Sequence, residues 1–569
     1  MRLRAALLLW LAAGLASGAA LSFARGRGGA VAAEEETAAR VGADILRRGG
    51  NATDAAVAVA FALAVTWPEA GNLAGGGFWI SRDGAGRVRT IDFRERAPRA
   101  ARRDMFLRPA KAGGQPPSST EGPLASGVPG SVAGLALAHR GGGKLPWKTL
   151  VEPAVRLARD GFVMTENVRE SIAAEKARLA RDPETAAIFL PGGEPPAVGS
   201  RFKQPALART LEAIAERGED GFYRGRLARA IEQEQKRSGG LITRGDLALY
   251  SAKERPAVSF RLGEALVFTT PAPSSGPALA EMALLAQALG LEKFRARDAA
   301  SAHLTAEIEK RAFYDRNRIL GDPDFGGVRQ SLFTSAERAR RLAATIDPAR
   351  ATPVGALPGL DPRDMSTTHF SVADALGNVV AVTTTLNDSF GNARVAAGMG
   401  FLWNNEMDDF ATRPGQPNLF GLVQGESNAV APGKRMLSSM CPTVAVIPGR
   451  GVFAWGTAGG STILTTTFQV LLGLSPRLES LEAAVAAPRF HQQDRPDVVE
   501  YEREGFDAGW IAALEEKGHA TKVSARGPVP GRIGRVHAVA ILPGGETEAV
   551  ADPRRHGAAF VAEPAPGSP

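Results

Sequence analysis

The chain has 569 residues, of which 44% are hydrophobic and 22% are charged, and this balance excludes a largely disordered protein. The 68 Lys and Arg residues exceed the 60 Asp and Glu residues, for a formal net charge of +8, but the two signs are interspersed and aromatic residues make up only 6%. We therefore expect no nucleic-acid partner and only a mild attraction for anionic substrates.

The N-terminus has the pattern of a secretory signal. Arg2 and Arg4 precede an uncharged Leu- and Ala-rich stretch that runs from Ala5 to Ala24. Ala19 and Ala24 each have Ser two residues earlier, and both are acceptable cleavage points. We predict a signal peptide over residues 1–24, export to the periplasm or the medium, and no stable membrane span after its removal. Twenty uncharged residues can also just cross a bilayer, so an uncleaved anchor is the alternative.

The rest of the chain mixes helical and strand patterns without a tandem repeat. Helical spacing covers 34–50 and the almost wholly apolar 51–65, strand patterns cover 78–84 and 87–98, and 146–254 is mainly helical. Residues 370–387 predict two strands around the turn at Gly377 and Asn378, and the last 80 residues return to strands before a disordered tail at 563–569. Residues 411–437 predict a long functional loop with too little apolar content to form core. This order predicts α/β or α+β layers.

Cysteine and histidine usage gives no sign of a metal. Cys441 is the single cysteine, which excludes an intrachain disulfide and a thiolate metal cluster. The seven histidines are spread from His139 to His556 without HExxH spacing. The run RGGGK ends at Lys144, and Leu145 follows where a phosphate-binding loop needs Ser or Thr.

Three hydroxyl residues, Ser366, Thr367 and Thr368, directly precede a strand pattern. β-Branched residues entering a strand are the simpler explanation of this cluster. The alternative is catalytic, because a chain cut before Thr367 would place a free α-amine, with a pKa of about 8, beside the threonine hydroxyl as its base.

Several sequence stretches together favour the catalytic explanation. The chain resembles the γ-glutamyltransferase family of N-terminal-nucleophile hydrolases, also called glutathione hydrolases, over nearly its whole length after the leader. The resemblance rests on these stretches in order: GGNATDAAVAVAFALAV, AGGGF, DFRERAP, GVPGSVAGL, GGLITRGDLALYSAKERP, PSSGPAL, AFYDRNRILGDPDF, STTHFSV, LNDSFG, NNEMDDF, KRMLSSMCPT, GTAGGS, PRFH and ADPRRHGAA.

The resemblance implies an α+β fold, a four-layer αββα sandwich, and a proenzyme that cleaves itself between Ser366 and Thr367. The large subunit would be 25–366, the small catalytic subunit 367–569, and the two would form one heterodimeric fold unit. Thr367 would take the γ-glutamyl group of glutathione or another γ-glutamyl amide as an acyl-enzyme. Water, an amino acid or a dipeptide would then accept it, and no cofactor is implied.

The resemblance also assigns the residues that would bind the two charges of the glutamyl head group. Arg94 would bind the α-carboxylate, which suits a planar guanidinium, with Ser438 and Ser439 adding hydroxyl donors. Asp409 would accept the α-ammonium, assisted by Glu406 and Asn387. The sequence alone does not separate Asp409 from its neighbour Asp408. It is also compatible with Arg94 as an exposed arginine at a strand end and with the serine pair as part of a turn.

The remaining assignments concern catalysis. Thr385 would orient the nucleophile, and Gly459 and Gly460 would form the oxyanion hole, since glycine lets backbone N–H groups approach an oxyanion closely. A strand threonine and a tight Gly-Gly turn are the plain alternatives. His369 is expected to be structural. Phe420 stands where many bacterial members carry a lid tyrosine, so its ring would cover the site without a phenolic hydroxyl.

Two other functions are compatible with parts of this pattern. A cephalosporin or glutaryl acylase of the same superfamily would also use an N-terminal nucleophile, but a glutaryl group has no α-ammonium to pair with Asp409. A non-catalytic binder of γ-glutamyl peptides would not need Thr367 at all.

Overall fold

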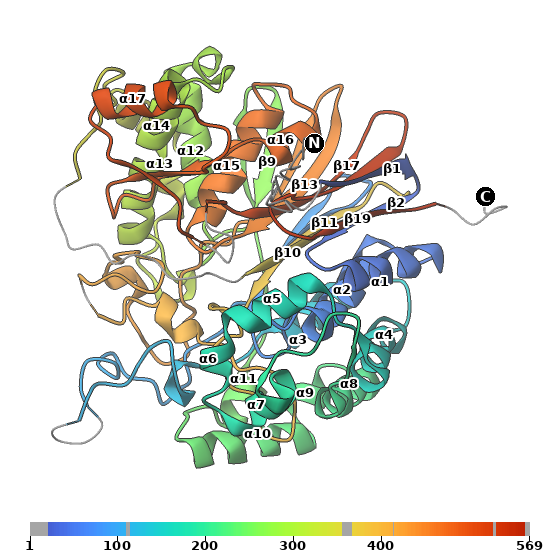
Figure 1. Cartoon of the computed structure of the whole chain (residues 1–569). Coiled ribbons are helices and arrows are strands. Elements are labelled where there is room, and N and C mark those ends of the chain that lie inside the picture. Colours follow the sequence, from blue (N-terminus) through green and yellow to red (C-terminus); the bar gives the residue numbers. More distant parts are fainter. Residues whose placement is uncertain (1–20, 110–113, 355–366, 414, 527–530, 564–569) are drawn as a thin grey trace, which may run out of the picture.

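The computed structural model describes residues 21–109, 114–354, 367–413, 415–526 and 531–563 (Figure 1). Most of the predicted leader, Ser366 and nearly all of the predicted disordered tail lie outside the described residues. Two seven-stranded antiparallel sheets form the centre. The first has the order β1 (Ser22–Arg27), β18 (Glu546–Ala551), β17 (Arg535–Ile541), β13 (Gly451–Ala458), β12 (Thr443–Ile447), β9 (Ala265–Thr269) and β8 (Val258–Leu262). The second has the order β19 (Ala558–Ala562), β2 (Gly29–Ala33), β10 (Thr368–Ala373), β11 (Val379–Thr385), β3 (Gly76–Arg82), β4 (Val88–Asp92) and β7 (Lys253–Arg255).

Helices cover the outer face of each sheet. The second sheet is covered by helices of the first half of the chain: α1 (Glu36–Arg47), α2 (Ala52–Thr66), α3 (Ser131–Gly142), α4 (Trp147–Asp160), α5 (Glu166–Ala174), α6 (Lys176–Leu179), α7 (Pro183–Phe189), α8 (Pro205–Arg217), α9 (Asp220–Tyr223), α10 (Gly225–Ser238) and α11 (Arg244–Leu249). The other side of the molecule holds α12 (Gly276–Leu289), α13 (Ala299–Ile319), α14 (Ala336–Ala343), α15 (Thr462–Leu474), α16 (Leu481–Ala486) and α17 (Ala508–Glu516). Small sheets add β5 (Phe162–Val163) with β6 (Arg201–Phe202), and β14 (Phe490–His491), β15 (Val499–Tyr501) and β16 (Thr521–Val523).

Successive side chains of a strand point to opposite faces of its sheet, and this alternation explains the layers. In β11, Val380 and Val382 pack with the helices of the first half, whereas Val379 and Ala381 pack against the other sheet, as the two-residue period of a strand requires. The core between the sheets consists mainly of alanine and valine, which allows the two sheets to approach closely. The four-layer αββα sandwich is therefore confirmed.

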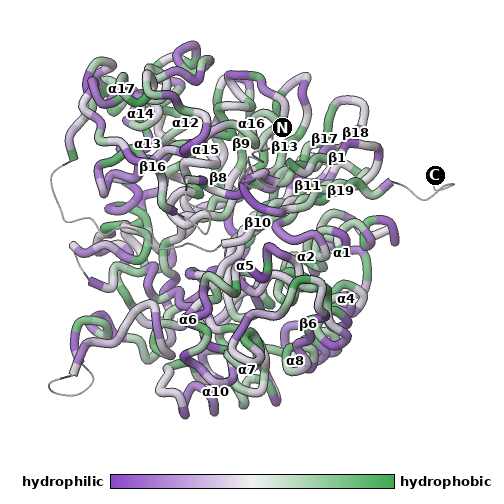
Figure 2. The backbone as a smooth tube through the Cα atoms, viewed as in Figure 1, coloured by the Kyte–Doolittle hydropathy of each residue, from purple (hydrophilic) through white to green (hydrophobic). Residues whose placement is uncertain are grey.

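The predicted helices around residues 34–65 are confirmed. Asn51 and Asp54 form a reciprocal capping box at the start of α2. This helix is buried on all sides, as its continuous apolar sequence predicts, and Figure 2 shows it in green while the outer α10 carries hydrophilic residues. The predicted turn at Gly377 joins β10 and β11.

Two expectations about local structure are wrong. The strand predicted over 87–98 ends at Asp92, where the Asp92 carboxylate accepts the Arg94 N–H at 3.0 Å and turns the chain into a loop. The 411–437 segment is a loop as predicted, but it does contribute to the core. Phe420, Leu422 and Leu437 are buried with the α12–α15 cluster, because the loop folds inward over the end of the sheets.

Strands from both sides of position 367 interleave in the sheets. β10 pairs with β2 on one side and with β11 on the other, and β11 pairs with β3. In the first sheet β12 likewise pairs with β9. Residues 21–354 and 367–563 therefore build one fold unit, and a break before Thr367 would leave shared hydrogen-bonded sheets holding two chains together.

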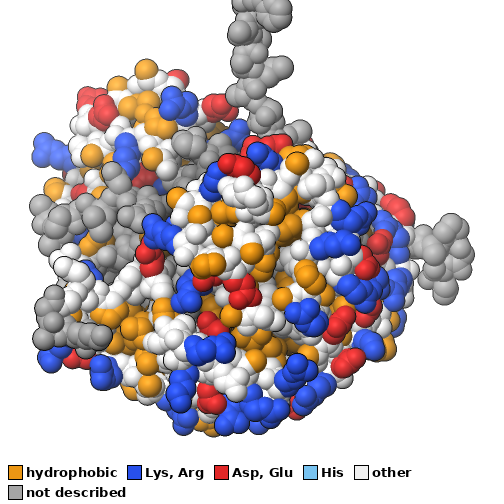
Figure 3. All heavy atoms as spheres, turned by 60° about the horizontal axis from the view of Figure 1, so that its bottom comes forward, with side chains coloured by type: hydrophobic (Ala, Val, Ile, Leu, Met, Phe, Trp, Pro, Cys, Tyr) orange, Lys and Arg blue, Asp and Glu red, His pale blue; other side chains and the backbone are white. Residues whose placement is uncertain are grey.

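The surface agrees with the dispersed charge of the sequence. Figure 3 shows Lys and Arg side chains interspersed with Asp and Glu over the visible face. Within the described ranges, no helix combines the length and apolar character needed to cross a membrane.

Candidate active site

Thr367 lies directly before β10, at the end of the second sheet. Its side chain is buried, with 4% of its surface exposed. Arg535, at the start of β17 in the other sheet, donates through Nη2 to the Thr367 carbonyl at 3.1 Å. Glu69 in turn accepts from Arg535 Nη1 at 3.3 Å. The backbone of Thr367 is thus held from both sheets.

Thr385, the last residue of β11, brings a second hydroxyl to Thr367. The two Oγ1 atoms are 3.3 Å apart, with Thr367 as the donor. Thr385 Oγ1 also accepts the N–H of Asn387 at 2.8 Å. Asn387 has a φ of 82°, a left-handed conformation that asparagine adopts more readily than most residues. The predicted orienting threonine therefore lies beside the predicted nucleophile.

Arg94 follows β4 and is fully buried. Its Nη1 atom pairs with Glu406 and its Nη2 atom with Asp409, while Nε donates to the Met436 carbonyl at 3.2 Å. The residues predicted for opposite ends of one zwitterionic ligand therefore contact each other. The possibility of an exposed arginine at a strand end is excluded.

The structure separates Asp409 from Asp408. Asp408 faces away from Arg94 and accepts from Ser119 Oγ at 2.6 Å and from the Leu419 N–H at 2.8 Å, so it holds the ends of two loops. Asp409 pairs with Arg94 and accepts from Asn418 Nδ2 at 3.2 Å. Asp409 is the one that lines the cavity beside Thr367.

Burial makes the acidic residues of this cluster hard to ionise. Burial raises the pKa of Glu406 to about 7, with Arg94 opposing and Asp409 adding to the shift. The pKa of Asp409 is also raised by burial, although Arg94 and Arg316 oppose it. Burial alone would lower the pKa of Arg94, but the adjacent carboxylates raise it, so the guanidinium stays charged.

Ser438 and Ser439 line the same cavity from the end of the 411–437 loop. Ser438 Oγ accepts the Met440 N–H at 3.2 Å, and Ser439 Oγ accepts from Arg316 Nη2 at 3.2 Å. Each hydroxyl thus receives a hydrogen bond from the protein, which leaves its own proton available for an acceptor in the cavity.

Gly459 and Gly460 join β13 to the N-terminus of α15. Their φ angles are 133° and 54°, and a Cβ atom on Gly459 would lie 2.4 Å from Thr462 Oγ1. A side chain is therefore excluded at Gly459 and strained at Gly460. Gly460 lines the cavity, and the N-terminus of α15 adds a positive helix dipole there.

Phe420 lines the cavity as well, and its side chain is 4% exposed. Its ring packs in the same apolar cluster as Leu422 and Leu437. The cavity has a volume of about 10 Å³, room for about one water molecule. A glutamyl group therefore enters only if the surrounding side chains or the loop move.

Comparisons with known proteins agree with this geometry. The model of the gamma-glutamyltranspeptidase family matches residues 38–562. The glutathione hydrolase proenzyme of Escherichia coli (strain K12) is 43% identical over 537 residues, which cover 93% of this chain and 91% of that relative. The relative of the same name from Pseudomonas aeruginosa is 41% identical over 557 residues and covers 94% of this chain and 95% of its own. The chain belongs to the γ-glutamyltranspeptidase family.

Solved structures of similar proteins confirm the fold. Cephalosporin acylase from Bacillus halodurans has a TM-score of 0.84 at 24% identity, covering 98% of this chain and all (100%) of that one, which shows the shared fold alone. A γ-glutamyltranspeptidase chain from Pseudomonas nitroreducens has a TM-score of 0.52 at 38% identity. It covers 56% of this chain and 94% of its own length.

His369 is structural, as expected. It is fully buried, its Nδ1 lies 2.8 Å from Thr383 Oγ1, and its Nε2 lies 3.0 Å from Ser371 Oγ. Burial, together with the charge of His537, lowers its pKa well below the ordinary value, so the ring is neutral. Its ring nitrogens lie next to Thr383 and Ser371 rather than the predicted nucleophile. Within the described part of the chain, no group of His, Cys, Asp and Glu residues is arranged to hold a metal.

Three buried residues near this γ-glutamyltranspeptidase site were missed by sequence reasoning. Arg535 holds the Thr367 carbonyl, and Arg316 contacts Ser439. Gln493 donates to the Phe420 carbonyl at 3.0 Å and accepts from Ser461 Oγ at 2.5 Å, so it links the loop to the residue after Gly460. Arg316 lies within a stretch that carries the family resemblance, which was the one available signal.

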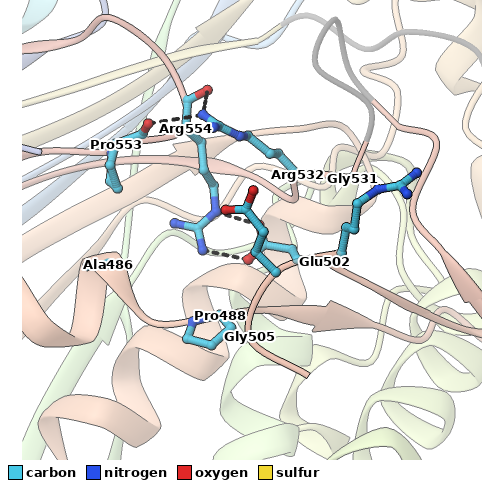
Figure 4. A pocket seen from close by; sticks show the side chains of 10 residues that line it. Ala486, Pro488, Glu502, Gly505, Gly531, Arg532, Pro553 and Arg554 are labelled. Atoms are coloured by element: carbon cyan, nitrogen blue, oxygen red, sulfur yellow. Dashed lines mark hydrogen bonds and ion pairs between the residues drawn. The ribbon is translucent and has the colours of Figure 1, made fainter. Parts of the chain in front are cut away.

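A larger cavity lies apart from these residues. It has a volume of about 420 Å³ and is lined by segments 486–488, 502–505, 531–532 and 553–554 (Figure 4). Arg554 reaches Glu502 through ion pairs in this region, and Arg532 donates to the Pro553 and Arg554 carbonyls. Arg532 and Arg554 therefore have partners within the protein, and none of the predicted catalytic residues lines this cavity.

Proposed function

We propose that this member of the γ-glutamyltranspeptidase family is a self-processing γ-glutamyltransferase with glutathione hydrolase activity. The observation that carries the proposal is the single cavity that Thr367, Thr385, Arg94, Asp409 and Gly460 share. γ-Glutamyl transfer requires a nucleophile, a hydroxyl that orients it, two side chains of opposite charge and a backbone N–H that donates a hydrogen bond to the oxyanion. The relatives with 41–43% identity over more than nine-tenths of the chain are named glutathione hydrolase proenzymes.

Maturation begins with Thr367. Its Oγ1 attacks the carbonyl carbon of Ser366, the Ser366–Thr367 C–N bond breaks, and the Thr367 nitrogen takes up a proton to become a free amine. Water then hydrolyses the resulting ester and restores the threonine hydroxyl. This yields a large subunit that ends at Ser366 and a small subunit of 367–569. Supporting this, strands of both parts interleave in each sheet, and the solved P. nitroreducens chain corresponds to just over half of this one.

The same hydroxyl then attacks the γ-carbonyl of the donor. The new α-amine accepts the hydroxyl proton, and the tetrahedral oxyanion is stabilised by the N–H groups of Gly459 and Gly460. Collapse of this intermediate releases the amine, which takes the proton, and leaves a γ-glutamyl ester on Thr367. Water produces glutamate from the ester, and an amino acid or dipeptide amine produces a new γ-glutamyl amide. No cofactor enters these steps.

Recognition of the donor rests on exchange of ion pairs. Arg94, with Ser438 and Ser439, binds the α-carboxylate, and Asp409, with Glu406 and Asn387, binds the α-ammonium. Since Arg94 and Asp409 already pair with each other, a zwitterionic α-amino acid head group can insert between them and satisfy both. Phe420 closes over the bound group as the lid.

The N-terminal segment directs export in this proposal. β1 begins at Ser22, and Ala24 pairs with Ala549 of β18. Cleavage after Ala24 would remove half of this strand, whereas cleavage after Ala19 would keep it, so we favour Ala19. N-terminal sequencing of the mature large subunit decides between the two sites.

The test is a denaturing gel of the purified protein together with a glutathione assay with and without glycylglycine. Two bands and release of Cys-Gly support the proposal, and faster release with glycylglycine identifies transfer. A single band and no turnover would instead favour a binder of γ-glutamyl peptides. Turnover of glutaryl but not γ-glutamyl amides would favour an acylase.

A further inference from the structure

Arg316, in the last turn of α13, is a buried cation that the reaction described above does not use. Its side chain is 1% exposed. Each of its three nitrogens donates to a neutral acceptor: Nε to Ser275 Oγ at 2.7 Å, Nη1 to Asn317 Oδ1 at 2.7 Å and Nη2 to Ser439 Oγ at 3.2 Å. Within the described ranges, no carboxylate forms an ion pair with this guanidinium. A charge buried in this way is costly unless an anion compensates it.

The position of Arg316 shows where that anion belongs. Arg94 donates to the carbonyls of Met436 and Leu437, and Arg316 contacts Ser439, so the two guanidiniums hold successive residues of one segment. Burial lowers the pKa of Arg316 to about 10, Asp409 opposes this and Arg94 adds to it, so the group stays cationic at neutral pH. Both positive charges therefore act on the cavity that Ser438 and Ser439 line.

The hydrogen bonds of Arg316 also determine which way the serine hydroxyls point. A guanidinium is only a donor, so Ser439 Oγ must act as the acceptor of this contact and must direct its own proton elsewhere. Ser275 Oγ likewise accepts from Arg316 and gives its proton to the Ser438 carbonyl at 2.6 Å. Ser275 N–H further donates to the Met440 carbonyl at 3.0 Å. Arg316 thus holds the segment 438–440 in two ways, directly through Ser439 and indirectly through Ser275.

We propose that Arg316 is a positioning and specificity residue for the donor's α-carboxylate: it turns the Ser439 hydroxyl toward that carboxylate as a donor and supplies a second positive charge behind it. The inference rests on the proposed function, and it assigns to α13 a part of donor selection. A ligand that keeps the α-ammonium but lacks the α-carboxylate gains nothing from Arg316.

The test compares L-glutamate with its α-amide, L-isoglutamine, by isothermal titration calorimetry on the mature two-chain protein. The two ligands differ only at the α-carboxyl group. In the wild type, glutamate should bind more tightly than isoglutamine. Arg316→Gln should reduce glutamate affinity at least tenfold and isoglutamine affinity less than twofold. Equal losses for both ligands, or an unchanged preference for glutamate, would overturn the proposal.

Three further variants keep the result interpretable. Arg316→Lys retains the charge but not the contacts to three acceptors, so it should lose part of the preference for glutamate over isoglutamine. If Arg316→Gln fails to yield two chains, Arg316→Lys serves as the test variant. Combining Arg316→Gln with Ser439→Ala should cost less than the sum of the single changes, because both act on one hydroxyl; full additivity would contradict the positioning role. Arg318→Gln, two residues along on the partly exposed side of α13, is the matched control and should leave the preference unchanged.

Binding also separates this inference from the proposed function. A wild type that binds glutamate but does not cleave γ-glutamyl amides would refute the transferase, while the Arg316 comparison would still be decided by affinity. A wild type with no preference for glutamate over isoglutamine would refute the carboxylate role of Arg316, whatever its catalytic activity.

Discussion

The charge cluster around Arg94 predicts that γ-glutamyl donors bind much more weakly below neutral pH. Burial raises the pKa of Glu406 to about 7, because Arg94 offsets only part of the lost hydration and Asp409 adds a like charge. Glu95, buried beside Arg94, has its own pKa raised well above the ordinary value by burial and by Glu406. Below neutral pH Glu406 is protonated, and the proton competes with the donor's ammonium for this carboxylate.

The size of the effect follows from the titration. Each pH unit below the pKa costs about tenfold in affinity, about 1.4 kcal/mol, when binding requires the ionised form. Because Glu406 with a pKa of about 7 is already half protonated at pH 7, the limit between about pH 7 and pH 5 is about 50-fold. Asp409 would also bind the ammonium, so we expect a rise in KM between about tenfold and that limit. The α-carboxylate and α-ammonium of the donor do not titrate in this range.

The assay is the KM of a γ-glutamyl anilide measured from about pH 5 to pH 8. Glu406→Gln should flatten the profile, because the amide keeps the shape of the side chain but does not titrate. Glu426→Gln is the control, since Glu426 is an exposed carboxylate of the same loop that pairs with Arg103. A constant KM in the wild type, or a slope that survives in Glu406→Gln, would refute the reasoning.

Protonation of Glu406 has opposite effects on stability and on donor binding, so its effect on KM can be distinguished from acid unfolding. The folded pKa of Glu406 is raised above its unfolded value of about 4.3, so protonation favours the folded state. Its stabilising contribution is fully present below about pH 4.3 and is lost as the pH rises through about 7. Through this group, acidification from pH 7 to pH 5 therefore weakens donor binding without lowering the melting temperature.

The other predictions concern maturation, the carboxylate and the lid. Thr367→Ala should remain one uncleaved, inactive chain on a denaturing gel while Thr367→Ser still processes; a small subunit starting at residue 367 in the Ala variant would exclude autocatalysis by this hydroxyl. Arg94→Lys should process normally but raise the donor KM at least about tenfold, since lysine cannot bridge two partners, and unchanged kinetics would remove Arg94 from the site. Phe420→Ala should lower the melting temperature, because truncation of a buried phenylalanine costs about 3–5 kcal/mol, and should shift the product ratio toward hydrolysis. A lower melting temperature with an unaltered ratio would mean that the ring only anchors the loop.

The sequence predicts those parts of the site in which one residue type is chemically required at a recognisable position. Thr367 stands before a strand pattern, and Arg94 and Asp409 lie in short charged stretches of the family pattern. The structure places all three residues around one cavity, as expected for parts of one site. The two-sheet core is also predictable, since strand periodicity and small apolar residues are local properties.

The contributions of Arg316, Arg535 and Gln493 could not be predicted from the sequence. Each lies far along the chain from its partner: Arg535 contacts Thr367, and Gln493 contacts Phe420, only because the sheets and the loop bring them together. The strand end at Asp92 has a different, local cause, because the Asp92 carboxylate accepts the N–H of Arg94 two residues later, and the strand pattern of the sequence does not reveal this bond. The polar composition of the 411–437 loop predicts no contribution to the core, because its few apolar residues become buried only in the folded structure.

The pairing of Arg94 with Asp409 predicts that this chain prefers a γ-glutamyl group to the glutaryl group of an acylase substrate, although the fold is shared with a cephalosporin acylase. Arg94 and Asp409 form a buried ion pair. In the proposed binding mode a γ-glutamyl head group would break this pair and form two, one between its carboxylate and Arg94 and one between its ammonium and Asp409. A glutaryl group brings a carboxylate but no ammonium, so it would take Arg94 and leave Asp409 buried without a counter-charge. Breaking one partner out of a buried pair costs about 3–5 kcal/mol. In this binding mode Arg94 and Asp409, which pair with each other in the structure, would favour the zwitterionic γ-glutamyl group over its deaminated glutaryl analogue.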